Sequence, residues 1–228
     1  LWPFRAGIKP VAFLTVREDK VARALEGFGK VQVERRDRRV HVGPQDAWTD
    51  RRDLGEPRVE LFVSAEPTPA RRAADLQAGD PSAAGVELGE LLGYPACCVR
   101  AFVAQNDRSN NSANRYACAS RSGGLDARDP WPWELNDLFV KLVPFFPCSY
   151  RCEKALEFAQ TSLAALEAAH PGALGHARSW LSKPVLYFDD EHQIVFDRSR
   201  PGSESAQPDA ALSYVTVHRT DGNRRDVE

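Results

Sequence analysis

The sequence of 228 residues predicts an α+β protein built from three parts. Short β-forming runs alternate with helical patterns over residues 1–80, helical periodicity dominates residues 81–182, and alternation of apolar and polar residues returns over residues 183–228. We therefore expect an N-terminal ferredoxin-like α/β unit, a central helical domain that carries the cysteines, and a small C-terminal β element.

The N-terminal unit is predicted from its order of patterns, which is strand, helix, hairpin, strand and helix. A charged run from Arg35 to Arg39 is interpreted as the solvated tip of the hairpin rather than as a phosphate site. The second helix opens with Thr68 as its N-cap and Pro69 at its first helical position. The predicted strands are 10–16, 31–33, 40–42 and 58–64, and the predicted helices are 18–28 and 68–76.

Helical patterns in the central part are separated by glycine and proline breaks, such as Gly93-Tyr94-Pro95. Residues 106–132 are polar and show little periodicity, which predicts a long loop. The last part is predicted to hold a hairpin around the acidic turn 189–192, followed by one more strand. The predicted helices are 82–92, 96–105, 133–143 and 149–169, and the predicted strands are 185–188, 194–196 and 213–218.

Charge and hydropathy argue against several classes of protein. The 30 basic and 32 acidic residues are well mixed, so the electrostatic footprint of a nucleic-acid binder is missing. No apolar stretch approaches the ~20 residues that span a bilayer. The first residues lack the pattern of a secretory signal, and a chain without Met is expected to have its natural start upstream. Five cysteines make a poor disulfide framework and suit a reducing compartment. Together with the charge and hydropathy patterns, this predicts a cytoplasmic protein that binds neither a membrane nor a nucleic acid.

Two segments place cysteines where helices are predicted to start. Cys97 and Cys98 follow one proline break, and Cys148 and Cys152 follow another. Thiols in the first turn of a helix face free N–H groups and the positive end of the helix dipole, which lowers their pKa. Cys148 and Cys152 are four positions apart and would share one helical face. If the two helix starts converge, four thiolates surround one point.

A cage of four thiolates suits an iron–sulfur cluster or a zinc ion. Zinc sites usually take pairs of cysteines separated by a few residues, and an adjacent pair is awkward on one tetrahedral ion. A cluster distributes its attachment points over several irons, so the pattern favours a [4Fe-4S] cluster over zinc. Two alternatives stay open, namely buried thiols that act as small apolar side chains and a disulfide between the helix starts.

Other side chains near these cysteines are candidates for contact with a cofactor or substrate. Arg115 and Arg151 are assigned that role, and Cys118 is interpreted as a spare ligand, a reactive thiol or neither. The acidic run 189–192 is interpreted as an exposed turn rather than a metal site. No triad or pair of carboxylates indicates a catalytic centre, so no catalytic residue is assigned.

The cysteine segments resemble the GYPxCCVxxF and PCSxxC blocks of an uncharacterised prokaryotic family. Here the blocks run from Gly93 to Phe102 and from Pro147 to Cys152, and residues 134–136 also look similar. The resemblance covers about residues 89–159 and does not reach the first 80 or so. It implies that the cysteines are the family's signature, and it implies no activity.

The favoured function is redox, radical or sulfur chemistry at a cluster held by the four cysteines Cys97, Cys98, Cys148 and Cys152. Such chemistry would need an electron donor or another protein partner. The alternative is a non-catalytic protein in which zinc or a disulfide holds the helices together, and the N-terminal unit binds a partner.

Overall fold

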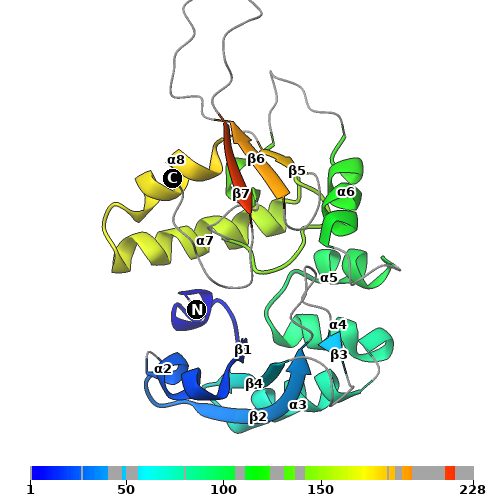
Figure 1. The fold of residues 1–228 in the computed structure, drawn as a ribbon, viewed down its shortest axis with the longest axis vertical. Helices are drawn as coiled ribbons and strands as arrows, with labels where there is room; N and C mark the ends of the chain where they lie inside the picture. Colours follow the sequence, from blue (N-terminus) through cyan, green and yellow to red (C-terminus); the bar gives the residue numbers. More distant parts are fainter. Residues whose placement is uncertain are drawn as a thin grey trace, which may run out of the picture.

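A computed structural model of the chain describes residues 2–26, 28–40, 48–49, 56–79, 81–105, 111–123, 131–136, 142–183, 185–187, 192–196 and 214–218. Within these residues the predicted α+β class is confirmed, with eight α-helices and two antiparallel sheets. Figure 1 shows the N-terminal sheet with α2, α3 and α4 in one half of the molecule, and α6, α7, α8 and the C-terminal sheet in the other.

The N-terminal sheet has the strand order β1-β4-β2-β3, and each neighbouring pair is antiparallel. Since β1 and β2 both run antiparallel to β4 between them, they are parallel to each other, as in a split βαβ unit. The strands are β1 (Val11–Val16), β2 (Gln32–Val40), β3 (Trp48–Thr49) and β4 (Glu56–Ser64).

Both faces of this sheet are covered. Val11 and Phe62 on one face pack against α3 (Pro67–Ala78), whereas Ala12 and Leu61 on the other face pack against α2 (Val21–Leu25). The alternation of side chains along a strand sends neighbouring residues to opposite faces, so β4 reads as a nearly continuous apolar run. The two helices α2 and α3 therefore lie on opposite sides of the sheet.

The predicted hairpin tip at Arg35 to Arg39 is wrong, because β2 runs without a break from residue 32 to residue 40. This charged stretch is paired with β4 along its whole length, from Gln32 with Ser64 to Val40 with Glu56, and its side chains form ion pairs. Arg35 pairs with Glu18 and Asp37, and Arg36 lies 3.6 Å from the buried carboxylate of Glu60. A sequence pattern does not reveal such partners, which come from other elements of the fold.

The helix predicted from Thr68 begins one residue earlier, at Pro67, and its N-cap is Glu66 rather than Thr68. Two prolines fit here because the first positions of a helix do not need their backbone N–H groups. The N–H of Glu66 donates to the hydroxyl of Ser64 at 3.2 Å, which fixes the step from strand to helix.

Helices α4 (Pro81–Leu91) and α5 (Ala96–Val103) meet at a tight turn around Gly93. Gly93 has a φ of 75°, and a Cβ there would lie 3.0 Å from Pro10. Gly89 on α4 lies against Val99 of α5, where an added Cβ would come within 2.6 Å of a methyl carbon. The close approach of the two helices therefore depends on a glycine.

The predicted loop over residues 106–132 is wrong for its middle part, because α6 (Asn111–Arg121) is a regular helix. Its inner face carries Asn114, Arg115 and Cys118, with Ser122 just beyond its end, and all four are buried. A helix with a polar inner face shows no apolar periodicity, so hydropathy missed it. Of the helix predicted over residues 133–143, residues 133–135 form a single 3-10 turn, η2 (Trp133–Leu135), residues 142–143 are not helical, and residues 137–141 lie outside the described residues.

The last helices and strands complete the second half of the molecule. Helix α7 (Glu153–Ala169) begins four residues later than predicted, and α8 (Ala173–Leu181), which no prediction covered, follows after Gly172 with a φ of 95°.

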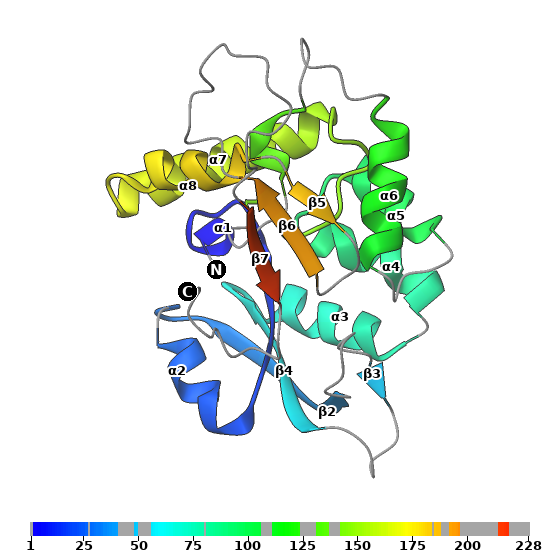
Figure 2. The same ribbon diagram turned by 45° about the horizontal axis from the view of Figure 1, so that its top comes forward.

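The C-terminal strands are confirmed as an antiparallel sheet of order β5-β6-β7 (Figure 2), whereas residues 189–191 of the acidic turn lie outside the described residues. The strands are β5 (Val185–Tyr187), β6 (His192–Phe196) and β7 (Tyr214–His218).

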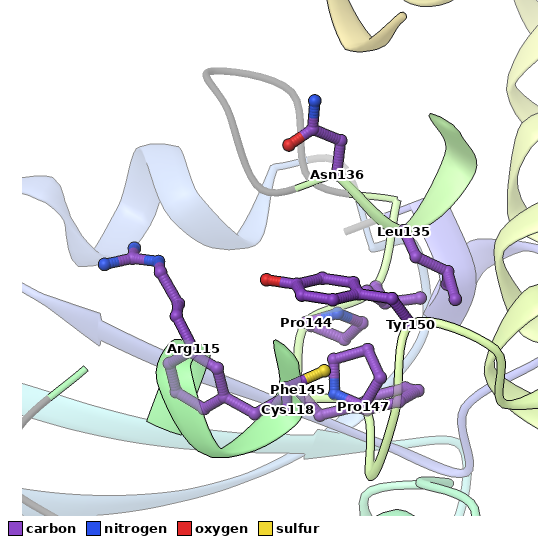
Figure 3. A pocket seen from close by; sticks show the side chains of 10 residues that line it. Arg115, Cys118, Leu135, Asn136, Pro144, Phe145, Pro147 and Tyr150 are labelled. Atoms are coloured by element: carbon purple, nitrogen blue, oxygen red, sulfur yellow. The ribbon is translucent and has the colours of Figure 1, made fainter. Parts of the chain in front are cut away.

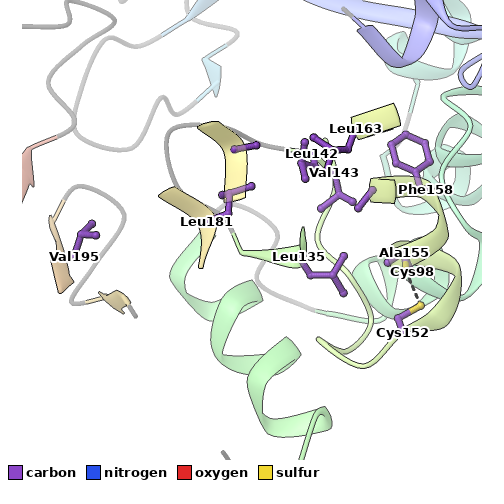
Figure 4. Close-up of a cluster of buried hydrophobic side chains, with 12 residues drawn as sticks. Cys98, Leu135, Leu142, Val143, Cys152, Ala155, Phe158, Leu163, Leu181 and Val195 are labelled. Carbon is purple, nitrogen blue, oxygen red and sulfur yellow. Dashed lines mark hydrogen bonds between the residues drawn. The ribbon is translucent and has the colours of Figure 1, made fainter. Parts of the chain in front are cut away.

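The largest apolar cluster lies between α7, α8 and the segment around η2 (Figure 4). It includes Phe158 and Leu163 of α7 and Leu181 of α8, and Cys98 and Cys152 belong to it as well. Two of the predicted ligand cysteines are therefore part of the core. Among the described residues, no helix is long and apolar enough to cross a membrane.

Substitution of Gly89 tests the contact between α4 and α5. Gly89→Ala is expected to lower the free energy of unfolding by about 1–3 kcal/mol, because the new methyl overlaps Val99. Gly175→Ala on α8, where no atom lies within 4 Å of an added Cβ, is the matched control and is expected to be neutral or stabilising by about 0.5–1 kcal/mol. Urea denaturation measures both, and equal effects at the two glycines would contradict the packing argument.

Lys9 gives a pH-dependent prediction. Burial lowers the pKa of Lys9 from 10.5 to about 8. The unfolded chain therefore holds the proton more tightly than the folded one between these values, so the free energy of unfolding rises with pH across that window. Relative to Lys9→Met, the wild type should gain about 3 kcal/mol between pH 7 and pH 11 in urea denaturation. A constant difference between the two proteins would show that Lys9 is not perturbed.

Candidate metal centre

The start of α5 holds the first two cysteines. Pro95 is the N-cap, and its carbonyl accepts from the N–H of Cys98 at 2.8 Å and of Val99 at 3.0 Å. Cys97 and Cys98 therefore occupy the second and third helical positions, as the sequence predicted. The side chain of Cys98 points into the core, with 1% of its surface exposed, while Cys97 is partly buried.

The second pair lies in a turn rather than on a helix. Cys152 is the N-cap of α7, and Cys148 precedes the helix, so the prediction that both share one helical face is wrong. The N–H of Cys152 donates to the carbonyl of Ser149 at 3.1 Å, and the N–H of Arg151 donates to the Ser149 hydroxyl at 3.0 Å. This turn, and not a helical repeat, brings the two thiols to the same side.

The end of α6 supports this turn. The buried hydroxyl of Ser122 accepts from the N–H of Tyr150 at 2.7 Å and donates to the carbonyl of Cys118 at 2.6 Å. Arg121 donates to the carbonyl of Cys148 at 2.7 Å, and Arg151 donates to the carbonyl of Ser122 at 3.0 Å. The turn that carries two cysteines is therefore fastened to a helix that sequence patterns did not reveal.

The four sulfurs converge on one point. The Sγ atoms of Cys97, Cys98, Cys148 and Cys152 all lie within 4.8 Å of one another. The Sγ of Cys152 is 3.7 Å from those of Cys97 and Cys98, which are 3.9 Å apart. The N–H of Cys148 also points to the Sγ of Cys98 at 3.4 Å. The group is compatible with metal binding, and all five cysteines of the chain are free thiols.

Burial and charge oppose full ionisation of these thiols. Burial raises the pKa of Cys98 above its ordinary range and raises the pKa of Cys148 to about 11. Burial also acts to raise the pKa of Cys152, but the N–H of Ala155 and the neighbouring thiols outweigh it, and its pKa is lowered. Four thiolates this close would repel one another strongly, so a cation is needed to hold them together.

The remaining candidates take different positions. Cys118 does not belong to the group of four; burial raises its pKa to about 12, and it lines a neighbouring pocket together with Arg115. Arg151 is exposed, and its bond to Ser122 shows a role in shaping the turn. Asn136, next to the same pocket, donates to the carbonyls of Leu181 and Lys183 at 2.9 and 3.2 Å. It ties the residues after η2 to the end of α8.

Sequence reasoning missed Ser122 and Arg121, which position the turn. Both lie in a polar stretch without periodicity, and the only signal available was the spacing of Asn114, Arg115, Cys118 and Ser122, which suits one helical face. Polar residues at that spacing do not distinguish a buried face from a solvated one. Only the packed structure separates these two cases.

Residues 56–168 match the model of a family described as a protein of unknown function, DUF483. The expected resemblance to an uncharacterised family is confirmed. The match begins in β4, so the expectation that the resemblance leaves out roughly the first 80 residues is wrong. No curated protein and no solved structure matches the chain.

Removal of the Ser122 hydroxyl tests the support of the turn. Ser122→Ala leaves the N–H of Tyr150 without its partner, and we expect the free energy of unfolding to fall by about 1–3 kcal/mol. Ser120→Ala, at an exposed position of the same helix, is the control and should change stability by less than about 0.5 kcal/mol. The support argument fails if urea denaturation finds the two variants alike.

Proposed function

We propose that the protein binds one metal ion, zinc before others, through the thiolates of Cys97, Cys98, Cys148 and Cys152, and that this ion fastens α5 to the start of α7. The observation that carries the proposal is the spacing of the sulfurs. Three of their separations lie between 3.7 and 3.9 Å. A tetrahedral zinc ion with Zn–S bonds of about 2.3 Å holds its sulfurs about 3.8 Å apart.

The adjacent pair no longer argues against a single ion. An adjacent pair is awkward when both side chains must turn toward one point, yet the sulfurs of Cys97 and Cys98 lie 3.9 Å apart, as two corners of one tetrahedron require. A cluster attaches its cysteines to several irons, so its sulfurs stand further apart than those on one ion. The spacing therefore favours one ion over the [4Fe-4S] cluster that the sequence pattern favoured.

Four protein ligands favour a structural role over a catalytic one. Catalytic zinc sites keep one position open for water or substrate, whereas a set of four thiolates is closed. Cys98 and Cys152 belong to the main apolar cluster, and they are 54 positions apart in the sequence. One ion there would join two distant segments at the centre of the helical half and would contribute directly to its folding.

A second candidate keeps the redox or sulfur chemistry of a [4Fe-4S] cluster, together with an electron donor as partner. Its support is the position of two of the ligands. Cys97 and Cys148 are only partly buried, and Cys148 lies outside any helix, so the group can widen at this side without loss of a helical hydrogen bond. A cluster near the surface would also be within reach of an electron donor.

Anaerobic purification with metal and sulfide analysis separates the candidates. We expect one equivalent of zinc per chain, no inorganic sulfide and no absorption near the ~400 nm region typical of thiolate-bound iron. Cys148→Ala should lose the metal because three thiolates bind zinc far more weakly than four do. Cys118→Ala is the matched control and should keep it, since Cys118 is outside the group of four.

Each other result has a definite meaning. Iron and sulfide in equal amounts, lost together in Cys148→Ala, would replace the zinc proposal with the cluster. No metal in protein purified with zinc in every buffer would contradict both candidates. Loss of zinc in Cys118→Ala with retention in Cys148→Ala would mean that the ligand set is wrong.

A further inference from the structure

The four sulfurs of the candidate centre differ in their access to solvent. Cys98 and Cys152 are buried in the main apolar cluster, where Figure 4 draws the contact between their side chains. Cys97 and Cys148 are only partly buried. A small oxidant that arrives from solvent therefore meets Cys97 or Cys148 before it meets the other two. The centre thus has two outer and two inner sulfurs.

An outer sulfur bound to a metal ion keeps its reactivity toward oxidants. A cysteine that ligates a metal is deprotonated, and the thiolate is the form of cysteine that reacts with peroxides. Oxidation selects thiolates that are accessible and that lie next to a second cysteine able to form a disulfide. Both conditions can be examined for each of the outer sulfurs.

Cys97 has such a second cysteine at close range. The Sγ of Cys152 lies 3.7 Å from the Sγ of Cys97. A disulfide bond is about 2.05 Å long, so the two sulfurs together would have to move by only roughly 1.6 Å. Cys152 is the N-cap of α7, but its side chain makes no capping hydrogen bond. Its sulfur can therefore turn toward Cys97 without the loss of a bond that holds the helix.

Other pairings are less suitable. Cys98 is next to Cys97 in the sequence, and a disulfide between neighbours closes a small ring that strains the planar peptide bond between them. Cys148 is held on both sides of its backbone. Its N–H points to the Sγ of Cys98 at 3.4 Å, and its carbonyl accepts from Arg121 at 2.7 Å. The geometry therefore selects the pair of Cys97 and Cys152.

Cys118 is a natural comparison within the same chain. It does not belong to the group of four, 1% of its surface is exposed, and it lines a separate pocket together with Pro147 and Tyr150 (Figure 3). Burial raises the pKa of Cys118 to about 12, so this thiol stays protonated near neutral pH. A buried and protonated thiol reacts slowly with peroxide.

We propose that Cys97 and Cys152 form a reversible oxidation site, at which hydrogen peroxide produces a disulfide between α5 and the start of α7 and thereby displaces the metal ion. The inference rests on the proposed zinc centre and adds the class of reagent that regulates it. Two thiolates, those of Cys98 and Cys148, would remain, and two thiolates hold zinc far more weakly than four do.

The reaction balances in two steps. The Cys97 thiolate attacks hydrogen peroxide, the O–O bond breaks, and a sulfenic acid and a hydroxide ion form. The Cys152 thiolate then attacks the sulfur of Cys97, so that an S–S bond forms, the S–O bond breaks and a second hydroxide leaves. Two electrons pass from the thiolates to the peroxide. A dithiol reductant reverses the oxidation by thiol–disulfide exchange.

Titration of the zinc-loaded full chain with hydrogen peroxide tests the proposal in the presence of a dye that reports free zinc. The zinc content is measured first, before any peroxide is added. We expect one zinc ion to be released for each peroxide consumed, and we expect dithiothreitol with added zinc to restore the original content.

Mass spectrometry of peptides prepared without reductant identifies the linked cysteines. Trypsin cleaves after Arg151, so Cys148 and Cys152 fall on different peptides. Fragmentation of the linked peptides then distinguishes Cys97 from Cys98, which share a peptide. The expected link joins Cys97 and Cys152. These measurements use the wild-type protein, so no variant has to fold.

The matched control is Cys118→Ala, which should release zinc and form the link as the wild type does. Zinc that stays bound in a molar excess of peroxide would overturn this inference and leave the metal centre intact. Release without a disulfide, or a disulfide between other cysteines, would overturn it as well. Absence of zinc before peroxide is added would contradict the metal centre itself, and the inference with it.

Discussion

The convergence of four thiols at one point is the constraint on which the helical half of the molecule depends. Sulfurs within 4.8 Å of one another can be neutral and packed, or ionised around a cation, but they cannot all be ionised alone. Two of them lie in the main apolar cluster, so the state of the thiols and the packing of α7 and α8 are linked. A metal ion bound by the four sulfurs would add its binding free energy to the free energy of folding of this core.

The geometry of the centre is produced by its surroundings more than by the cysteines themselves. Pro95 starts one helix so that two adjacent thiols reach the same side, and Ser122 and Arg121 hold the turn that supplies the other two. The same helix, α6, contributes Arg115 and Cys118 to the lining of the neighbouring pocket. One helix thus contributes to the pocket and, through Arg121 and the following Ser122, to the support of the cysteine turn.

The residues that match the family model include the cysteines and the elements that support them. Residues 56–168 include β4, α3 and every element that carries or supports the cysteines, from α4 to nearly the end of α7. They leave out β1, β2 and the C-terminal sheet. Within the described structure, the matched part therefore contains the whole candidate centre and the pocket beside it. Strand β4 and helix α3, which packs on the N-terminal sheet, also lie within the matched residues.

The sequence by itself determined the α+β class, the positions of the strands with strong apolar runs and the identity of the four cysteines. These depend on local periodicity and on the chemistry of single residues, which a sequence displays directly. Only the tertiary structure decided the course of the charged strand β2, the existence of α6 and the arrangement of the sulfurs. β2 is held by its backbone pairing with β4, and Arg121 at the end of α6 and Ser122 just beyond it bond to the backbone of Cys148 and Tyr150. Partners so distant in sequence leave no local pattern, because hydrogen bonds and charges act through space and not along the chain.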